Sequence, residues 1–357
     1  MKKLYLALSY GENFGWGVCS KYLKKEISRI YPETILLDNL YSQEQKVHLD
    51  GIAFHALVSH ELETLYQARA DINIGYCFFE QELNNNSLKN AQNYNLVLGG
   101  SSWNEYKLKQ AGIYHSGKLI QGIDPDLFFY QPPKDYNNFV IFSGGKFELR
   151  KSQDVVIKAV SIMQKKYPDV VLINAWFNMW PKTMLNMSIS KHIKFNLRGN
   201  NYLEMINNIL LDNKIDLNRT ITLELVPNHK LKDIYKLTDV GLFPNRCEGG
   251  TNLVLMEYLA SGRTAIVTNA TGHKDVINDN ITYTLNNNKP FHIYNGQILL
   301  HDWIEPDLDE VLYNLEYAYH HREENMQKGL LASREMLNFT WEKSAQSFIN
   351  SIKKYLW

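Results

Sequence analysis

Two glutamates flank a predicted glycine turn and the helix that follows it. Glu248 lies in the turn, and Glu257 lies inside the helix, six residues beyond Thr251. That separation is about 9 Å along a helix, at roughly 1.5 Å per residue. The first amides of a helix and its dipole favour a phosphate group, and a carboxylate at this distance can accept hydrogen bonds from ribose hydroxyls. The spacing therefore indicates a site for a nucleotide diphosphate.

A strand–turn–helix–strand unit is predicted to hold these glutamates. The apolar run Val240–Phe243 is typical of a buried parallel strand. The helix is predicted to open at Thr251-Asn252 with Thr251 as its N-cap, and Gly262 favours its C-terminal end. Residues 264–267 then form the next strand. The turn leaves free amides and the positive end of the helix dipole facing outward.

Three cations follow a second predicted strand, at residues 139–143. Lys146, Arg150 and Lys151 come directly after a glycine pair that ends in Gly145. Cations at the carboxyl end of a strand suit a diphosphate through charge-assisted hydrogen bonds. A solvated basic turn explains this cluster equally well when it is taken alone. Beside the two glutamates, the phosphate interpretation is favoured.

The N-terminus shows a weaker form of the same arrangement. A strand at residues 4–9 is followed by GENFGWG (residues 11–17) and by a helix predicted at residues 18–30. This order is similar to a dinucleotide-binding opening, but the spacing is G-x-x-x-G-x-G rather than G-x-G-x-x-G. A tight turn with a close helix accounts for these glycines equally well.

Predicted strands alternate with helices through both halves of the chain. In the first half the strands are predicted at residues 4–9, 34–37, 51–57, 72–79, 95–98 and 118–121. In the second half they are predicted at residues 139–143, 170–176, 221–226, 240–243 and 264–267, with an apolar run at 193–197, a polar loop at 178–191 and helices at 153–165, 202–211 and 231–237. This rhythm predicts an α/β fold with parallel, doubly wound sheets.

A domain boundary is indicated where three prolines fall within nine residues, directly after Asp124. We expect an N-terminal Rossmann-like domain at residues 1–132 and a second such domain at 133–335. Residues 336–357 are expected to form a helix that begins near Trp341 and has an apolar stripe at helical spacing. Two doubly wound domains place a ligand in the cleft between the carboxyl ends of their strands.

Composition excludes several classes of function. The 357 residues carry 38 basic and 38 acidic side chains, so an extended nucleic-acid footprint is not expected. Three widely separated cysteines argue against a disulfide framework and for a reducing compartment. The first apolar run is too short for a signal peptide, and no stretch reaches the ~18 apolar residues of a membrane span. We expect a cytoplasmic protein, at most peripheral on the inner face of a membrane.

Other candidate sites are weaker. Asp124-Pro125-Asp126 has the D-x-D form that holds Mg²⁺ or Mn²⁺ in many nucleotide-sugar enzymes, but the central proline favours a turn. The histidine pairs lack further ligands, so no zinc site and no other metal site is expected. Glu80 ends a predicted strand at the cleft edge, where it either faces a substrate sugar or is simply hydrated.

Together these segments resemble the family 4 retaining glycosyltransferases of the GT-B fold, over nearly the whole chain. The segments that carry the resemblance are GENFGWG (11–17), NIGYCFFE (73–80), GIDPDLF (122–128), SGGKFELRKSQD (143–154), NRCEGGTNLVLMEYLASG (245–262) and FTWEKSAQSF (339–348). The resemblance implies two Rossmann-like domains facing a central cleft, with the C-terminal helix crossing back to domain one. The donor would be held mainly by domain two and the acceptor by domain one.

The resemblance also assigns roles to individual residues. Lys146 and Lys151 match a basic pair on the diphosphate, Glu257 a ribose-binding glutamate, and Glu248 a glutamate that faces the donor sugar. The implied donor-binding residues are Gly15, Gly17, Gly145, Arg150, Gly249, Gly250, Thr251, Asn252, Leu253 and Glu257. The lysines and Glu248 are expected at the reaction centre, and the side chains of Glu257 and of both lysines are expected at the cleft surface.

The sequence departs from the family pattern at two places. Eight residues separate Glu248 from Glu257 where the family has seven, and the extra residue falls in the glycine turn. A histidine common at the end of a domain-one strand is absent, and Glu80 lies in that region. The role of Glu257 is therefore better supported than that of Glu248.

The resemblance implies a hexosyltransferase-type reaction with retention of configuration and without a metal or cofactor. The co-substrate would be a nucleotide diphosphate sugar, and the acceptor a saccharide or lipid-linked molecule in surface polysaccharide or glycan synthesis. Front-face attack, in which the leaving diphosphate takes the acceptor proton, requires charge stabilisation rather than a strong protein base. A catalytically silent sugar-nucleotide-binding subunit, or an epimerase or phosphorylase on the same frame, remains open.

Overall fold

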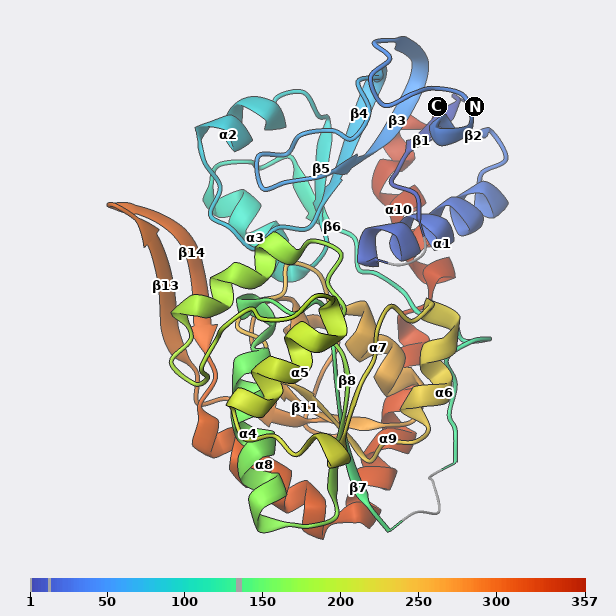
Figure 1. Cartoon of the computed structure of the whole chain (residues 1–357). Helices are drawn as coiled ribbons and strands as arrows, with labels where there is room; N and C mark the ends of the chain where they lie inside the picture. The colour runs from blue at the N-terminus through green and yellow to red at the C-terminus, as the bar shows by residue number, and fades with distance from the viewer. Residues whose placement is uncertain (1, 12–13, 133–136) are drawn as a thin grey trace.

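The chain folds into two α/β domains, one above the other in Figure 1. The structure is a computed structural model that describes residues 2–11, 14–132 and 137–357. Positions 12–13 of the GENFGWG loop and 133–136 of the predicted linker lie outside these residues. Each domain contains a six-stranded sheet in which the described strands pair in parallel. The predicted pair of doubly wound sheets is confirmed.

Domain one has the strand order β2-β1-β3-β4-β5-β6. Its strands are β1 (Leu4–Ala7), β2 (Thr34–Leu36), β3 (His48–Leu57), β4 (Arg69–Cys77), β5 (Leu96–Gly99) and β6 (Ser116–Lys118), and its helices are α1 (Gly15–Ile30), α2 (Asn85–Ala91) and α3 (Ser102–Gln110). Strand β1 is buried throughout, β3 over its last seven residues and β4 over its last five, as expected for parallel strands covered on both faces.

Domain two has the strand order β12-β11-β10-β7-β8-β9. Its strands are β7 (Phe139–Gly144), β8 (Val170–Ala175), β9 (Thr220–Thr222), β10 (Val240–Phe243), β11 (Thr264–Thr268) and β12 (Tyr283–Leu285), and its helices are α4 (Gln153–Lys166), α5 (Tyr202–Asp212), α6 (Leu231–Tyr235), α7 (Leu253–Ala260), α8 (Leu308–His320) and α9 (Arg322–Glu335). The central strands β7, β10 and β11 are buried at every position.

A two-stranded antiparallel hairpin follows the sheet of domain two and was not predicted. Its strands are β13 (Lys289–Asn295) and β14 (Ile298–Glu305), joined through Gly296 at φ +59°. The hairpin projects from the molecule at the left of Figure 1, beside α2 and α3 of domain one. Most of its side chains are exposed or half-buried, so its alternating pattern lacks the apolar run of a core strand.

Some element boundaries also differ from the prediction. β9 spans three residues instead of 221–226, because it is an edge strand that pairs only with β8. Residues 193–197 form neither a helix nor a strand; Ile193, Phe195 and Leu197 pack on the core of domain two without a strand to pair with. The predicted polar loop contains a 3₁₀ segment at Pro181–Ile189. No described helix is long and apolar enough to cross a membrane.

The last helix, α10 (Trp341–Ile352), leaves domain two and packs on α1 of domain one. Phe348 is fully buried and stacks on Phe54 of β3 at 4.0 Å between ring centroids. The Trp341 ring stacks on Tyr22 of α1 at 5.5 Å. Both termini consequently lie together on domain one (Figure 1).

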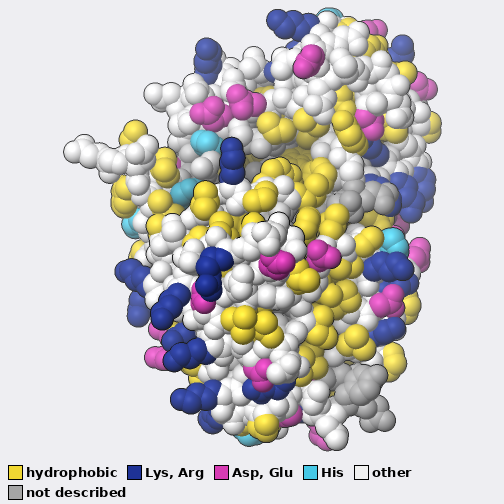
Figure 2. Space-filling view, viewed as in Figure 1, with side chains coloured by type: hydrophobic (Ala, Val, Ile, Leu, Met, Phe, Trp, Pro, Cys, Tyr) yellow, Lys and Arg dark blue, Asp and Glu magenta, His cyan; other side chains and the backbone are white. Residues whose placement is uncertain are grey.

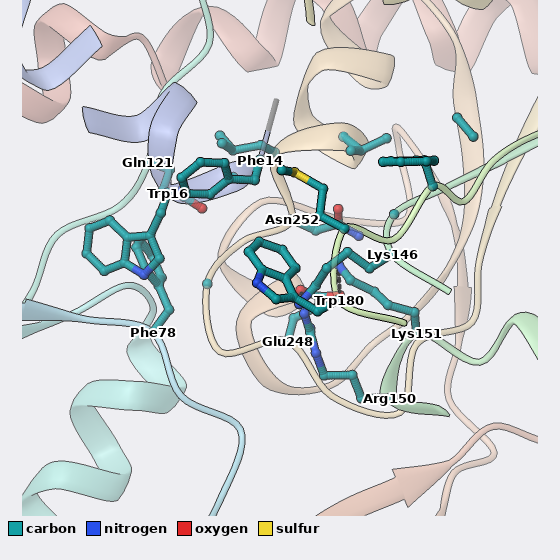
Figure 3. Close-up of a pocket in the computed structure, with 18 of the residues that line it drawn as sticks. Phe14, Trp16, Phe78, Gln121, Lys146, Arg150, Lys151, Trp180, Glu248 and Asn252 are labelled. Carbon is teal, nitrogen blue, oxygen red and sulfur yellow. Dashed lines mark hydrogen bonds and ion pairs between the residues drawn. The ribbon is translucent and has the colours of Figure 1, made fainter. Parts of the chain in front are cut away.

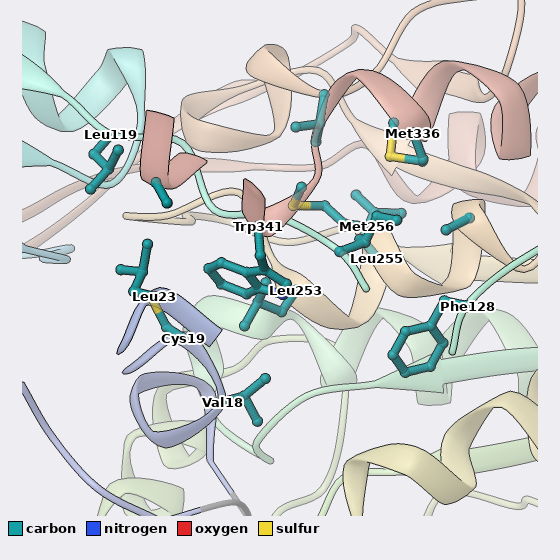
Figure 4. Packing of buried hydrophobic residues seen from close by; sticks show 14 of the residues in the cluster. Val18, Cys19, Leu23, Leu119, Phe128, Leu253, Leu255, Met256, Met336 and Trp341 are labelled. Carbon is teal, nitrogen blue, oxygen red and sulfur yellow. The ribbon is translucent and has the colours of Figure 1, made fainter. Parts of the chain in front are cut away.

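An apolar cluster at the foot of the cleft joins the two domains (Figure 4). Val18 and Leu23 of α1 meet Leu253 and Met256 of α7 around the buried Trp341 ring. Because one continuous cluster includes side chains from both sheets, the two carboxyl edges are held facing each other. The candidate site lies between those edges.

Replacing Phe348 with alanine should destabilise the protein by about 3–5 kcal/mol, the usual cost of deleting a fully buried phenylalanine. Ser347→Ala, on the exposed side of the same helix, should change stability by less than about 0.5 kcal/mol. Urea denaturation of both variants measures the difference. Equal stability of the two variants would show that α10 contributes little to holding domain one together.

Candidate active site

A cavity of about 400 Å³ lies between the domains. Its walls come from loops at the carboxyl ends of β1, β4, β7, β8 and β10, the edge where doubly wound sheets bind ligands. Figure 2 shows the opening as a hollow lined largely by hydrophobic side chains. Polar and charged residues also line the cavity: Glu80, Gln121, Lys146, Arg150, Lys151, Glu224, Glu248 and Asn252.

A compact group of charges forms the floor of this cavity (Figure 3). The Nζ atom of Lys151 lies 2.5 Å from Oε1 of Glu248, and Nη1 of Arg150 lies 3.3 Å from Oε2. The Asn245 amide also donates to Oε1 of Glu248. Arg150 further pairs with Glu148 at 2.6 Å and with Glu80 at 3.2 Å. Cations and carboxylates therefore balance one another here.

The expectation that Glu257 and both lysines lie at the cleft surface is wrong for Glu257 and Lys151, whose side chains are buried. The side chains of Lys151 and Glu248 are only 9% and 5% exposed, whereas that of Lys146 is 36% exposed. Burial alone would raise the pKa of Glu248, but the charges of Lys151 and Arg150 outweigh it and hold the pKa at about 2. Glu248 is thus ionised throughout the physiological range.

Lys146 lies at the mouth of the cavity, against an aromatic ring. Its Nζ atom lies 5.1 Å from the ring centroid of Trp180, a cation–π distance. The Trp180 ring meets Phe14 of domain one edge-on at 5.9 Å. Since its ammonium group is less buried than that of Lys151, Lys146 is better placed to meet an anion that enters from solvent.

The turn between β10 and α7 differs from the prediction at its end. The helix begins at Leu253, and the N-cap is Asn252, in the left-handed region at φ 64°. Thr251 is not the N-cap; its hydroxyl donates to the sulfur of Met256. The Asn252 side chain lies 3.2 Å from Nε2 of the buried His273 instead of capping the helix. Consequently the first amides of α7 receive no side-chain cap.

The glycines of this turn allow close approach of the two domains. Gly250 lines the cavity together with Asn252, Leu253 and Val254. A Cβ atom on Gly249 would lie 2.4 Å from the carbonyl oxygen of Phe79 in domain one, so no side chain fits there. Because the first turn of α7 leaves its amides without partners inside the helix, this wall of the cavity can donate hydrogen bonds to an anion.

Glu257 does not line the cavity. It is 3% exposed, and its Oε1 atom accepts a hydrogen bond of 2.8 Å from Asn228, while Oε2 has no partner among the described residues. Burial raises the pKa of Glu257 to about 8, and the Asn228 hydrogen bond only partly opposes this shift. Asn228 therefore occupies the hydrogen-bonding position at Oε1 of Glu257.

The remaining predicted residues are distributed around the cavity. Gly15 lines it, and Gly145 lines it in a positive-φ conformation beside the Lys151 side chain. Gly17 lies behind it, where a Cβ atom would meet the Gly11 carbonyl oxygen at 2.3 Å. The Glu80 carboxylate lines the cavity and accepts a hydrogen bond from the Gly249 amide at 3.3 Å.

Asp124 forms a turn. Its Oδ1 atom accepts from the Asp126 amide at 3.0 Å, and its carbonyl accepts from Phe128. Among the described residues, no group of three or more His, Cys, Asp or Glu side chains is arranged to hold a metal ion.

Sequence reasoning missed the aromatic wall on the domain-one side. Phe14, Trp16 and Phe78 line the cavity, and the Trp16 and Phe78 rings meet at 4.7 Å (Figure 3). Phe14 and Trp16 belong to the GENFGWG loop, and Phe78 lies two residues before Glu80. Aromatic residues at or just after the ends of two predicted strands are the sequence feature that indicates this wall.

A second missed group fixes the turn that carries Glu248. Arg246 is 1% exposed and makes two hydrogen bonds of 2.8 Å to Asp154 and one of 2.6 Å to Glu305. His192 meets the same Glu305 carboxylate at 2.6 Å. Because Arg246 stands two positions before Glu248, this buried group anchors the turn on α4 and on β14.

Comparisons with known proteins agree with this architecture. Residues 126–293, just under half of the chain, match the family model "Glycosyl transferases group 1". A sucrose-phosphate synthase from Thermosynechococcus elongatus superposes with a TM-score of 0.65 at 12% identity, over 99% of each chain. Anabaena HepE, solved with UDP and with UDP-glucose, superposes with a TM-score of 0.64 at 13% and 12% identity, over 99% of this chain and 100% of HepE.

The comparison with curated proteins found no match. At 12–13% identity, the solved structures show the fold, which is that of the GT-B glycosyltransferases. The GT-B prediction is confirmed, and membership of family 4 stays a prediction.

Glu257 and Glu248 should give opposite pH dependences of stability. The Glu257 carboxyl keeps its proton when folded up to a pKa of about 8, but when unfolded it loses it near 4.5. Stability from this group therefore falls as pH rises through that window. Glu257→Gln, which cannot ionise, should gain stability relative to the parent protein from pH 5 to pH 9.

Glu248→Gln is the matched comparison. The depressed pKa of Glu248 contributes stability that is fully present above pH 4.5 and lost towards pH 2. This variant should be less stable than the parent by a similar amount at pH 5, 7 and 9. Urea denaturation at these three values tests both variants. A Glu257→Gln curve parallel to the parent curve would mean that Glu257 is ionised in the folded protein.

Proposed function

We propose that the protein is a retaining glycosyltransferase that moves a hexose from a nucleotide diphosphate sugar to a saccharide or lipid-linked acceptor. One observation carries the proposal: three cations, the uncapped start of α7 and the ionised Glu248 converge on a single cavity between two Rossmann-like domains. The match to the glycosyltransferase family model supports it. HepE, which shares the fold, was solved with UDP-glucose.

The diphosphate would lie between the glycine turns after β7 and β10. There it would receive hydrogen bonds from the first amides of α7 and charge from Lys146 and Lys151. The ribose would lie towards Glu257, after Asn228 has moved from Oε1. In this arrangement Asn228 holds the carboxyl in place until ribose hydroxyls replace its amide.

The acceptor would lie on the domain-one side, between the aromatic residues and Glu80. Its hydroxyl oxygen attacks C1 of the donor sugar while the bond from C1 to the diphosphate oxygen breaks. The departing diphosphate oxygen takes the acceptor proton on the same face, so configuration is retained. The protein then needs to stabilise the growing negative charge and hold the acceptor hydroxyl on the face from which the diphosphate departs. Lys146 and Lys151 supply the charge.

The defining experiment incubates the purified protein with a panel of nucleotide sugars and oligosaccharide acceptors. Thermal stabilisation identifies the donor, because a ligand at 100 times its Kd adds about 2.7 kcal/mol. NMR of the product gives the anomeric configuration. Binding without turnover or slow hydrolysis would indicate a silent subunit. Release of a sugar isomer without acceptor would indicate an epimerase, and a strict need for inorganic phosphate would indicate a phosphorylase.

Transfer should survive chelation, because the cations Lys146, Arg150 and Lys151 are proposed to perform the charge stabilisation that a divalent ion performs elsewhere. Initial rates with and without EDTA should agree within a factor of about two, well below the tenfold that 1.4 kcal/mol represents. Loss of turnover in EDTA, with recovery on adding Mg²⁺ or Mn²⁺, would overturn this proposed mechanism.

Substitution of Glu257 should change the donor KM, whereas substitution of the lysines should change kcat. Glu257→Ala removes ribose hydrogen bonds worth about 0.5–1.5 kcal/mol each, because the carboxyl is neutral below its pKa of about 8. Because these bonds exist in the ground and transition states alike, donor KM should rise with kcat nearly unchanged. Lys146→Ala and Lys151→Ala should lower kcat by on the order of 10²–10³. Each lysine is proposed to stabilise the negative charge that grows on the diphosphate as its bond to the sugar breaks.

Melting curves separate catalysis from folding in this series. Lys146→Ala should melt like the parent because the side chain is partly exposed. Lys151→Ala leaves Glu248 buried without its nearest cation, which typically costs about 3–5 kcal/mol. Kinetics therefore need a temperature well below both transitions. A normal kcat with only a raised donor KM in Lys151→Ala would make this lysine an anchor rather than a catalytic group.

A further inference from the structure

The β13–β14 hairpin belongs to domain two by connection, yet its second strand contacts domain one (Figure 1). The amide of Glu82 donates to the carbonyl of Leu300 at 2.9 Å. Lys107 of α3 donates to Glu82 at 2.7 Å and to Asp302 of β14 at 3.1 Å, and its side chain is only 9% exposed. The hairpin is therefore held on domain one by a backbone hydrogen bond and by an ion pair.

The base of the hairpin is fixed on domain two. Glu305 at the end of β14 binds Arg246, and the Ile304 amide donates to the Arg246 carbonyl at 3.2 Å. The Phe291 ring of β13 covers the Arg246 guanidinium at 5.0 Å. Since Arg246 is itself held by the buried Asp154, the hairpin starts from a rigid support rather than from a loop.

Two side chains of β14 converge on one carbonyl group of domain one. The indole Nε1 of Trp303 donates to the carbonyl oxygen of Glu80 at 2.7 Å, and Nδ1 of His301 lies 3.3 Å from the same atom. Burial lowers the pKa of His301, so its ring is neutral and donates from Nδ1. Trp303 is 4% exposed and stacks between His301 and Phe291.

The side chain of Glu80 extends from that fixed carbonyl into the cavity. Its carboxylate lies 3.2 Å from Arg150 and accepts from the Gly249 amide at 3.3 Å. One residue thus connects the hairpin, through its backbone, to the charge cluster around Glu248, through its carboxylate. Trp303 is not among the described residues that line the cavity, and its hydrogen bond to the Glu80 carbonyl links it to the site.

We propose that the β13–β14 hairpin is a positioning element of the transfer site, and that Trp303 is a positioning residue that acts by holding the Glu80 backbone. This inference rests on the proposed glycosyl transfer. With its carbonyl held, Glu80 keeps its carboxylate in contact with Arg150 and with the Gly249 amide. These groups of domain two then stay aligned with the aromatic side chains of domain one. Releasing the carbonyl lets the strand-end segment Phe78–Glu82 drift, which misaligns the acceptor wall while leaving the donor contacts of domain two intact.

The first test needs no substrate. Trp303→Phe keeps the ring stack but deletes the N–H donor. Trp103→Phe is the matched control, because that ring packs against Phe79 of the same segment and makes no hydrogen bond with the described residues. Hydrogen–deuterium exchange of the peptide covering residues 78–82 should rise at least several-fold in Trp303→Phe and stay at the parent rate in Trp103→Phe. Equal exchange in all three proteins would overturn the proposal, whether or not the protein is active.

The second test is a double-mutant cycle on kcat with saturating donor and acceptor. Trp303→Phe should lower kcat about tenfold, or ~1.4 kcal/mol, with donor KM changed less than twofold. In a Glu80→Ala background the same substitution should lower kcat by clearly less than tenfold, because the carboxylate is gone and only the Phe78 side of the segment remains to be positioned. Tenfold losses that multiply in the double variant would mean that Trp303 acts only on general stability, and would overturn the proposal.

The proposed function and the proposed role of Trp303 can be contradicted separately. A parent protein that neither transfers nor hydrolyses any nucleotide sugar contradicts the proposed function, and the exchange test then decides the hairpin by itself. A parent protein that transfers sugar, with an additive cycle and unchanged exchange, keeps the proposed function and contradicts only the role of Trp303.

Discussion

The arrangement of the site depends on the buried charge cluster of Glu248 with Lys151 and Arg150. Three carboxylates and two cations are withdrawn from water at the point where the two domains meet. Burying any of them alone would be costly, so each one requires the others in place. The loops after β4, β7 and β10 contribute these charges, and their positions are therefore mutually dependent. Through the pair of Glu80 with Arg150, the cluster also ties domain one to domain two at the floor of the cavity.

Most of the fold could be predicted from the sequence because its signals are local. Apolar runs such as Val240–Phe243 lie at central sheet positions, and the glycine turns follow them directly. The edge elements were less predictable. Strand β9 is shorter than its apolar run. The β13–β14 hairpin has a largely polar pattern and makes hydrogen bonds with the other domain, which the local sequence does not indicate.

The site could be predicted only as a set of residues. The sequence indicates that Lys146, Lys151 and Glu248 gather at one edge, and the structure brings them to one cavity. It does not indicate that Glu248 already forms an ion pair with Lys151 or that Asn228 donates a hydrogen bond to Glu257. Those are contacts between segments far apart in the chain, and the spacing of apolar residues along the sequence does not predict such contacts. The mistaken N-cap at Thr251 has the same origin, because His273 lies next to the Asn252 side chain and helps to shape the turn.

The crossing of α10 to domain one has a consequence for synthesis on the ribosome. Residues 2–132 emerge before domain two, but the face of α1 and the ring of Phe54 obtain their cover only when residues 341–352 arrive. Domain two, by contrast, has its sheet complete once residue 285 has been made. Domain one is thus translated before domain two but closed after it. During that interval its uncovered apolar face is the part of the nascent chain most exposed to aggregation and to chaperones.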